Sequence, residues 1–176
     1  MDVLKTLADK AFWGHEFLTW LWFTAEEAGG EIEVPGFGPV SLWIEDRMLL
    51  GSLETDSKEN ILKDGDVSHS AEAAAALSVG KKLEEARFGL IREDREWAFT
   101  LKGESFDFQS VKIPKVISEE EDDVHATILI RLGHVRELTD LLDALYSHFA
   151  ELRVVPEWES EVVPAIGRWI AAKEGG

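Results

Sequence analysis

Residues 11–23 read AFWGHEFLTWLWF and contain three of the seven tryptophans of this 176-residue chain. On a helix, at about 100° per residue, one broad face carries the apolar side chains, which are Trp13, Phe17, Trp20, Leu21, Ala25 and Ala28. His15, Thr19 and Glu26 mark the polar side. The segment therefore predicts an aromatic helix that ends near Gly29-Gly30 and buries its apolar face in a core.

Trp22 and Phe23 lie outside this apolar face. Trp22 falls on the polar stripe and Phe23 lies away from the apolar centre, so the helix carries more apolar surface than one layer of core covers. Two explanations fit this surplus. Either the helix is central and its own chain covers it on all sides, or Trp22 and Phe23 are contacts in a homodimer.

The composition predicts one globular domain over residues 1–176, because 45% of the residues are hydrophobic and the length suits a single core. The absence of cysteine excludes disulfides, thiolate catalysis and cysteine-based zinc sites. We find no run of 18 uncharged apolar residues and no signal-peptide pattern. We therefore expect a cytoplasmic protein that does not interact with a membrane.

The formal charge of −17 argues against indiscriminate nucleic-acid binding, since phosphate contacts need lysine and arginine. The charge is uneven, however, because residues 81–115 carry eight bases against seven acids. If the chain binds DNA, we expect it to use these bases, which are Lys81, Lys82, Arg87, Arg92, Arg95, Lys102, Lys112 and Lys115. The alternative is that they are ordinary solvated side chains of strands.

The first half of the chain predicts two helices and then strands. Residues 2–11 form a short amphipathic helix before the aromatic one, and residues 31–34 form a candidate strand. Residues 40–44 and 49–53 alternate with period two on either side of Glu45-Asp46-Arg47, which predicts a hairpin. An alanine-rich helix follows, with Ser70 as its N-cap.

The second half predicts three more strands and two helical segments. The strands cover residues 82–92, 95–102 and 105–113, with a bulge near Gln109-Ser110. Ser118 to Glu121 form a capping box that opens a helix to about Leu152. Its apolar stripe comprises Val124, Ile128, Leu132, Val135, Leu138, Leu142, Leu145 and Phe149.

Arg131 falls within that stripe, so either Gly133 bends the helix and turns Arg131 outward, or Arg131 is paired in an interface. A last helical segment follows Pro156 and carries Trp158 and Trp169. Together these elements predict an α+β fold. Its antiparallel sheet of about five or six strands is flanked by the aromatic N-terminal helix and the long C-terminal helix.

Catalytic signatures are missing from this pattern. Asp122 with His125, and His134 with Glu137, have the spacing of helical metal ligands, but both pairs lie on one helix without a facing set. The sequence contains no nucleophile elbow and no phosphate-binding glycine-rich loop. We therefore expect no catalytic residue, no metal site, no cofactor and no enzymatic activity.

The order of these segments resembles the C-terminal half of the RdgC-like recombination-associated proteins. The resemblance covers about residues 11–150, through the aromatic segment Glu16-Phe-Leu-Thr-Trp-Leu, the junction Val79-Gly80-Lys81, the Leu90 and Phe99 strands, and Phe106-Asp-Phe-Gln-Ser-Val-Lys-Ile. It implies a bacterial, nucleoid-associated, ring-forming homodimer that binds double-stranded DNA without sequence preference and restrains a strand-exchange recombinase. It also implies that Lys81 lies at a helix-to-strand junction. The family's N-terminal half has no counterpart here, which leaves open a separate chain that supplies it.

Three functions follow from these observations. The first is a non-enzymatic DNA-binding, recombination-accessory protein, as the resemblance implies. The second is a protein-interaction or dimerisation module that has lost DNA binding, which the acidic charge favours. The third is a metal-dependent nuclease, which the missing ligand set disfavours.

Overall fold

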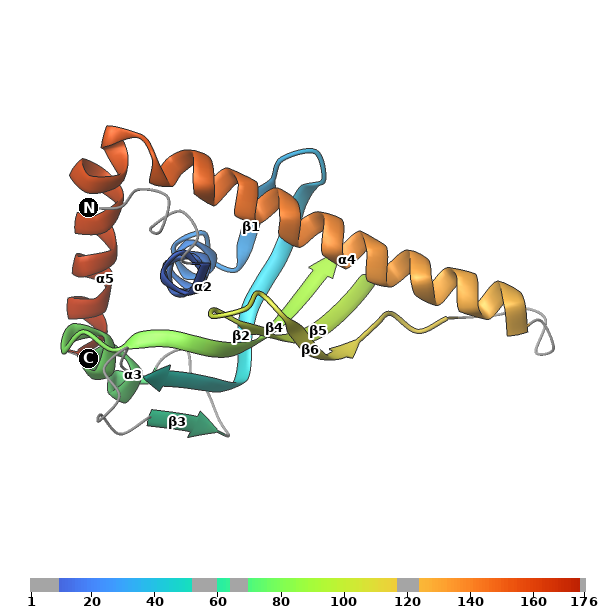
Figure 1. The fold of residues 1–176 in the computed structure, drawn as a ribbon, viewed down its shortest axis with the longest axis horizontal. Helices are drawn as coiled ribbons and strands as arrows, with labels where there is room; N and C mark the ends of the chain where they lie inside the picture. Colours follow the sequence, from blue (N-terminus) through green and yellow to red (C-terminus); the bar gives the residue numbers. More distant parts are fainter. Residues whose placement is uncertain (1–9, 52–59, 64–69, 117–123, 175–176) are drawn as a thin grey trace.

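A computed structural model describes residues 10–51, 60–63, 70–116 and 124–174. The fold is α+β, as predicted: a six-stranded antiparallel sheet in the order β1-β2-β4-β5-β6, with β3 pairing to β2, carries helices α2 and α4 on one face (Figure 1). The elements are α2 (Lys10–Glu27), β1 (Glu31–Val34), β2 (Gly38–Gly51), β3 (Asn60–Lys63), α3 (Ala71–Ser78), β4 (Lys82–Arg92), β5 (Arg95–Lys102), β6 (Phe108–Lys112), α4 (Val124–Arg153), the π-helical turn η2 (Trp158–Val162) and α5 (Val163–Glu174).

The aromatic segment forms α2, the centre of the core. Phe17 is buried, and its ring centroid lies 5.4 Å from that of Phe149 and 5.3 Å from that of Tyr146, both on α4. The helix ends where predicted, because Gly29 and Gly30 adopt positive φ angles that favour glycine. These contacts hold α2 between the sheet and α4.

The chain itself covers the surplus apolar surface of α2. Trp22 is only 1% exposed, and its ring centroid lies 4.7 Å from that of Trp169 on α5, which also contacts Phe23. Glu26 accepts hydrogen bonds from the indole nitrogens of Trp22 and Trp169, at 2.7 and 3.0 Å, and pairs with Lys173 at 2.6 Å. Helix α5 therefore occupies the surface at Trp22, so Trp22 is not available for the expected dimer contact, while Phe23 is partly covered.

The predicted hairpin at residues 40–53 is also wrong. Residues 38–51 form one continuous strand, β2, and both halves pair with β4. Ile44 pairs with Phe88 and Met48 with Ala86, so three residues of β2 oppose Arg87 alone. This is a bulge and not a turn, and the Arg87 guanidinium stabilises it by pairing with the Glu45 carboxylate at 2.5 Å.

The other strands and α3 follow the prediction. Ser70 caps α3 by accepting a hydrogen bond from the Ala73 amide. β4 and β5 have the predicted bounds, while β6 starts at Phe108, later than predicted. The register shift between β5 and β6, together with the positive φ of Ser110, confirms the bulge near Gln109-Ser110. The predicted helix at 2–11 and the capping box at 118–121 lie largely or wholly outside the described residues.

Helix α4 runs over the sheet and continues beyond it (Figure 1). Only the second half of its predicted apolar stripe is buried, at Leu138, Leu142, Leu145 and Phe149. Val124, Ile128 and Leu132 in the first half are exposed, as is Arg131. The stripe fails there because none of the described strands lies opposite this end of the helix (Figure 1).

Alanine substitutions at two separate glycines test how closely α2 packs against the sheet. An added Cβ at Gly14 would overlap the Gly103 carbonyl after β5, whereas one at Gly133 in α4 would meet nothing within 4 Å. We expect Gly14→Ala to lower the free energy of unfolding by more than about 2 kcal/mol, because two backbones would have to separate. Gly133→Ala should raise it by up to about 1 kcal/mol through helix propensity.

Urea denaturation followed by circular dichroism measures both effects. Equal stabilities for the two variants would contradict the close backbone approach at Gly14.

Candidate functional site

The eight predicted DNA-binding bases do not share a surface. Arg92 and Arg95 lie at the β4–β5 turn and reach α4, on the face of the sheet that the helices cover. Arg87 and Lys102 lie on the opposite face, whereas Lys81 and Lys82 lie at the other end of β4. Because β4 has 11 residues, these two ends lie about 30 Å apart.

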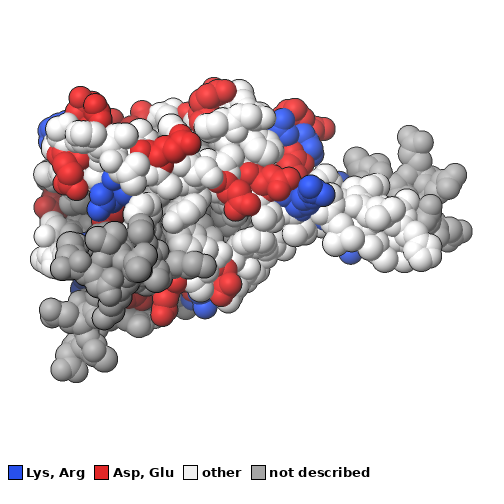
Figure 2. All heavy atoms as spheres, turned by 45° about the horizontal axis from the view of Figure 1, so that its top comes forward, with Lys and Arg blue, Asp and Glu red and all other residues white. Residues whose placement is uncertain are grey.

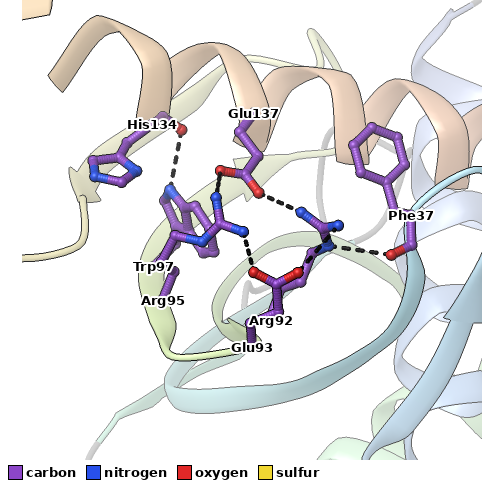
Figure 3. A network of polar contacts seen from close by, with 7 residues as sticks. All are labelled: Phe37, Arg92, Glu93, Arg95, Trp97, His134 and Glu137. Carbon is purple, nitrogen blue, oxygen red and sulfur yellow. Dashed lines mark hydrogen bonds and ion pairs between the residues drawn. The ribbon is translucent and has the colours of Figure 1, made fainter. Parts of the chain in front are cut away.

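Arg92 and Arg95 both bind the carboxylate of Glu137 on α4, and both also pair with Glu93 in the β4–β5 turn (Figure 3). Arg92 Nη1 donates to Glu137 Oε1 at 2.7 Å, and Arg95 Nη1 donates to Glu137 Oε2 at 2.6 Å. The three side chains are 15–28% exposed, so water screens them only partly. We call these three residues the Glu137 cluster.

The Glu137 cluster joins three parts of the fold. Arg92 Nε donates to the Phe37 carbonyl in the turn between β1 and β2, at 3.2 Å. The indole nitrogen of Trp97 donates to the His134 carbonyl one turn earlier on α4, at 3.1 Å. These bonds fix α4 at the point where it leaves the sheet, so the arginines act as structural anchors.

Pairing with carboxylates reduces the set of bases available for phosphates. Arg87 binds Glu45, and Arg92 and Arg95 bind Glu137. Lys112 and Lys115 are exposed, at the end of β6 and just after it. They line a cavity with His134, but Glu45, Asp94 and Glu96 line it as well, so its charge is mixed.

Lys81 and Lys82 line a second cavity, of about 330 Å³, between α2, α3, η2 and α5. Lys81 follows the end of α3, and β4 begins at Lys82, so the helix-to-strand junction is as the resemblance implies. Arg153 in this cavity pairs with Glu16 at 2.6 Å and contacts the Trp158 ring. The cavity therefore also has mixed charge.

A large apolar surface lies on residues 124–132, which we call the α4 tip. Five of its side chains are 43% to 69% exposed: Val124, Ile128, Leu129, Ile130 and Leu132. Figure 2 shows this end as a narrow projection that is mostly uncharged, beside a body with many carboxylates. The two faces of the helix both carry apolar groups here, since Ile128 and Ile130 point about 160° apart.

The sequence-based prediction did not include this exposed surface, although the sequence contains a signal for it. Ile128, Leu129 and Ile130 are consecutive, and a helix that packs on one sheet needs apolar side chains on one side only. The stripe pattern shows which residues are apolar but not where the sheet ends.

The described residues give no support to catalysis. Among them, no group of three or more histidine, aspartate or glutamate side chains could hold a metal ion. His125 is exposed on the α4 tip, Glu137 is committed to two arginines, and Asp122 lies outside the described residues. Burial raises the pKa of the Tyr146 hydroxyl, whose ring packs against Phe106 in the core. That hydroxyl therefore stays neutral near pH 7, and the ring of Tyr146 contributes to packing.

No protein-family model matches the chain, and no curated protein matches it. Within the described residues, no helix combines the length and apolar character needed to cross a bilayer.

The Glu137 cluster can be tested by removing one charge. Glu137→Gln keeps the shape but removes the carboxylate on α4 that both guanidinium groups share, leaving Glu93 as their carboxylate partner, so we expect the free energy of unfolding to fall by about 1–3 kcal/mol. The matched control is Asp140→Asn, which affects an exposed pair with Arg136 at 3.7 Å and should cost less than about 0.5 kcal/mol. Urea titration of both variants gives the comparison. Equal losses would mean that the cluster does not anchor α4.

Proposed function

We propose that this chain is a non-enzymatic protein-interaction module whose docking element is the α4 tip. The observation that carries the proposal is the exposure of five branched apolar side chains on one projecting helix end. Exposed apolar surface of this kind costs free energy in water, and contact with a partner recovers it. Helices commonly dock by laying apolar side chains at i, i+4 spacings into a partner.

The rest of the molecule supports a rigid presentation of this tip. The Glu137 cluster and the Trp97 to His134 bond fix α4 just before it leaves the sheet. Along the remainder of the helix, the side chains of Leu138, Leu142 and Phe149 are buried in the core. A partner therefore meets a preformed helix, which lowers the entropy cost of binding.

The apolar surface of the tip can be disrupted by substitution without disturbing the core. Ile128→Glu with Leu132→Glu places two charges on exposed positions, so the fold should survive while partner binding is lost. The matched control is Val79→Glu, because Val79 is 76% exposed but lies at the end of α3. Immobilised wild type and control should retain the same protein from a lysate, and the double variant should not.

Circular dichroism checks that all three proteins are folded. Retention of the same protein by the double variant at wild-type level would refute a docking role for the tip.

We also propose, as a second candidate, weak contact with double-stranded DNA in a recombination-accessory role, which the RdgC-like resemblance implies. The specific support is that Lys112 and Lys115 are exposed and line a cavity together with His134 of α4. With Arg87, Arg92 and Arg95 held by carboxylates, few bases remain for phosphates. A partner chain that completes the binding surface belongs to the same candidate.

This second candidate predicts a shallow salt dependence. If Lys112 and Lys115 each neutralise one phosphate, the logarithm of the duplex affinity should fall with the logarithm of salt at a slope of about −2. Lys112→Glu/Lys115→Glu should abolish binding, while Arg168→Glu, an exposed base on α5, should leave it unchanged. Fluorescence anisotropy of a labelled duplex measures this. No binding at low salt removes the candidate.

A further inference from the structure

We propose that the occupant of the α4 tip is a second copy of this chain, packed tip to tip in an antiparallel helix pair. This inference rests on the proposed docking function and names its partner. It replaces the dimer contact expected at Trp22 and Phe23, where α5 covers Trp22 and packs against Phe23.

The first argument is area. Taking about 180 Å² for a fully exposed Val, Ile or Leu residue, the three side chains on one side of the helix, Val124, Ile128 and Leu132, present about 310 Å² per copy. Two copies facing each other through this side bury about 600 Å² of apolar surface, which is the size of a weak, transient interface. A two-fold pair doubles the patch, because each copy supplies the surface that covers the other.

The second argument is the spacing of the side chains. Val124, Ile128 and Leu132 follow each other at intervals of four, so they form one ridge along the helix. In an antiparallel pair centred on Ile128, Val124 of one copy lies opposite Leu132 of the other, so apolar groups meet along the whole ridge. Arg131 and Arg136 lie about 60° and 80° from the centre of the ridge, at the solvated rim of such a pair.

The third argument is electrostatic. Each chain carries a formal charge of −17, so two bodies repel each other and contact between them is disfavoured. The α4 tip holds no acid in residues 124–132, and it extends away from the body. Antiparallel tips place the two bodies at opposite ends of the pair, about as far apart as this chain allows. Salt should therefore strengthen the dimer by screening the repulsion that remains.

Sedimentation velocity over a concentration series up to about 1 mM tests the dimer, since an interface of this size associates weakly. We expect Ile128→Glu to raise the dissociation constant at least about 100-fold, because the charge is repeated on both copies at the two-fold axis. Val79→Glu adds the same charge at a more exposed apolar residue and should leave the constant unchanged. Raising salt from about 0.05 to about 0.5 M should lower it.

The absence of native cysteine allows a direct test of geometry. Val124→Cys and Leu132→Cys proteins, each oxidised alone, should give little disulfide dimer, because like positions lie about 12 Å apart along the axis of the antiparallel pair. A mixture of the two should give a strong cross-linked band. Val79→Cys, whose position is exposed but distant, reports the background from random collisions.

The outcomes separate the two proposals. Cross-linking of the mixture above background, with sedimentation sensitive to Ile128→Glu, supports the antiparallel dimer. Cross-linking of each variant with itself overturns the antiparallel geometry. A monomer at every concentration with no cross-link overturns the dimer, and the docking function then stands only if the tip still captures another protein. If the protein is monomeric, gives no cross-link and captures no other protein through the tip, the docking function is refuted as well.

Discussion

The carboxylate of Glu26 accepts hydrogen bonds from the indoles of Trp22 and Trp169 and pairs with Lys173. These bonds close α5 over the side of α2 that the sheet does not cover. With that side covered, all the large apolar groups of residues 17–22 lie inside the chain. The apolar surface that a partner could use is therefore found on α4, far from the segment with the most tryptophan.

The position of α4 depends on a second, partly buried carboxylate. Glu137 pairs with Arg92 and Arg95 beneath the helix and, together with Glu93, balances their two positive charges. The same contact fixes where the helix stops following the sheet. Beyond it, residues 124–132 continue as a helix on which Val124, Ile128 and Leu132 are exposed. One long helix is thus buried on one side of this contact and has exposed apolar side chains on the other.

Much of the fold could be predicted because local patterns decide it. Glycines after Glu27 end α2, and period-two alternation gives β4 and β5. The corner at Glu45-Asp46-Arg47 was predicted as a turn, because its polar residues are typical of turns and the pairing with Arg87 lies 42 residues away. The candidate site failed for the same reason. Counting bases along residues 81–115 cannot reveal that Glu137, on another element, holds two of them.

Hydrogen exchange along α4 measures the role of the tip most directly, because it reads each backbone amide in the unmodified protein. Residues 128–132 lie in the part of α4 whose apolar side chains are exposed, so in dilute protein their amides should exchange fast, and those of residues 138–149 slowly. If the tip pairs with a second copy, its exchange should slow as protein concentration rises while the rest of the molecule is unchanged. Tip amides that exchange at one rate across all concentrations would contradict self-docking through α4.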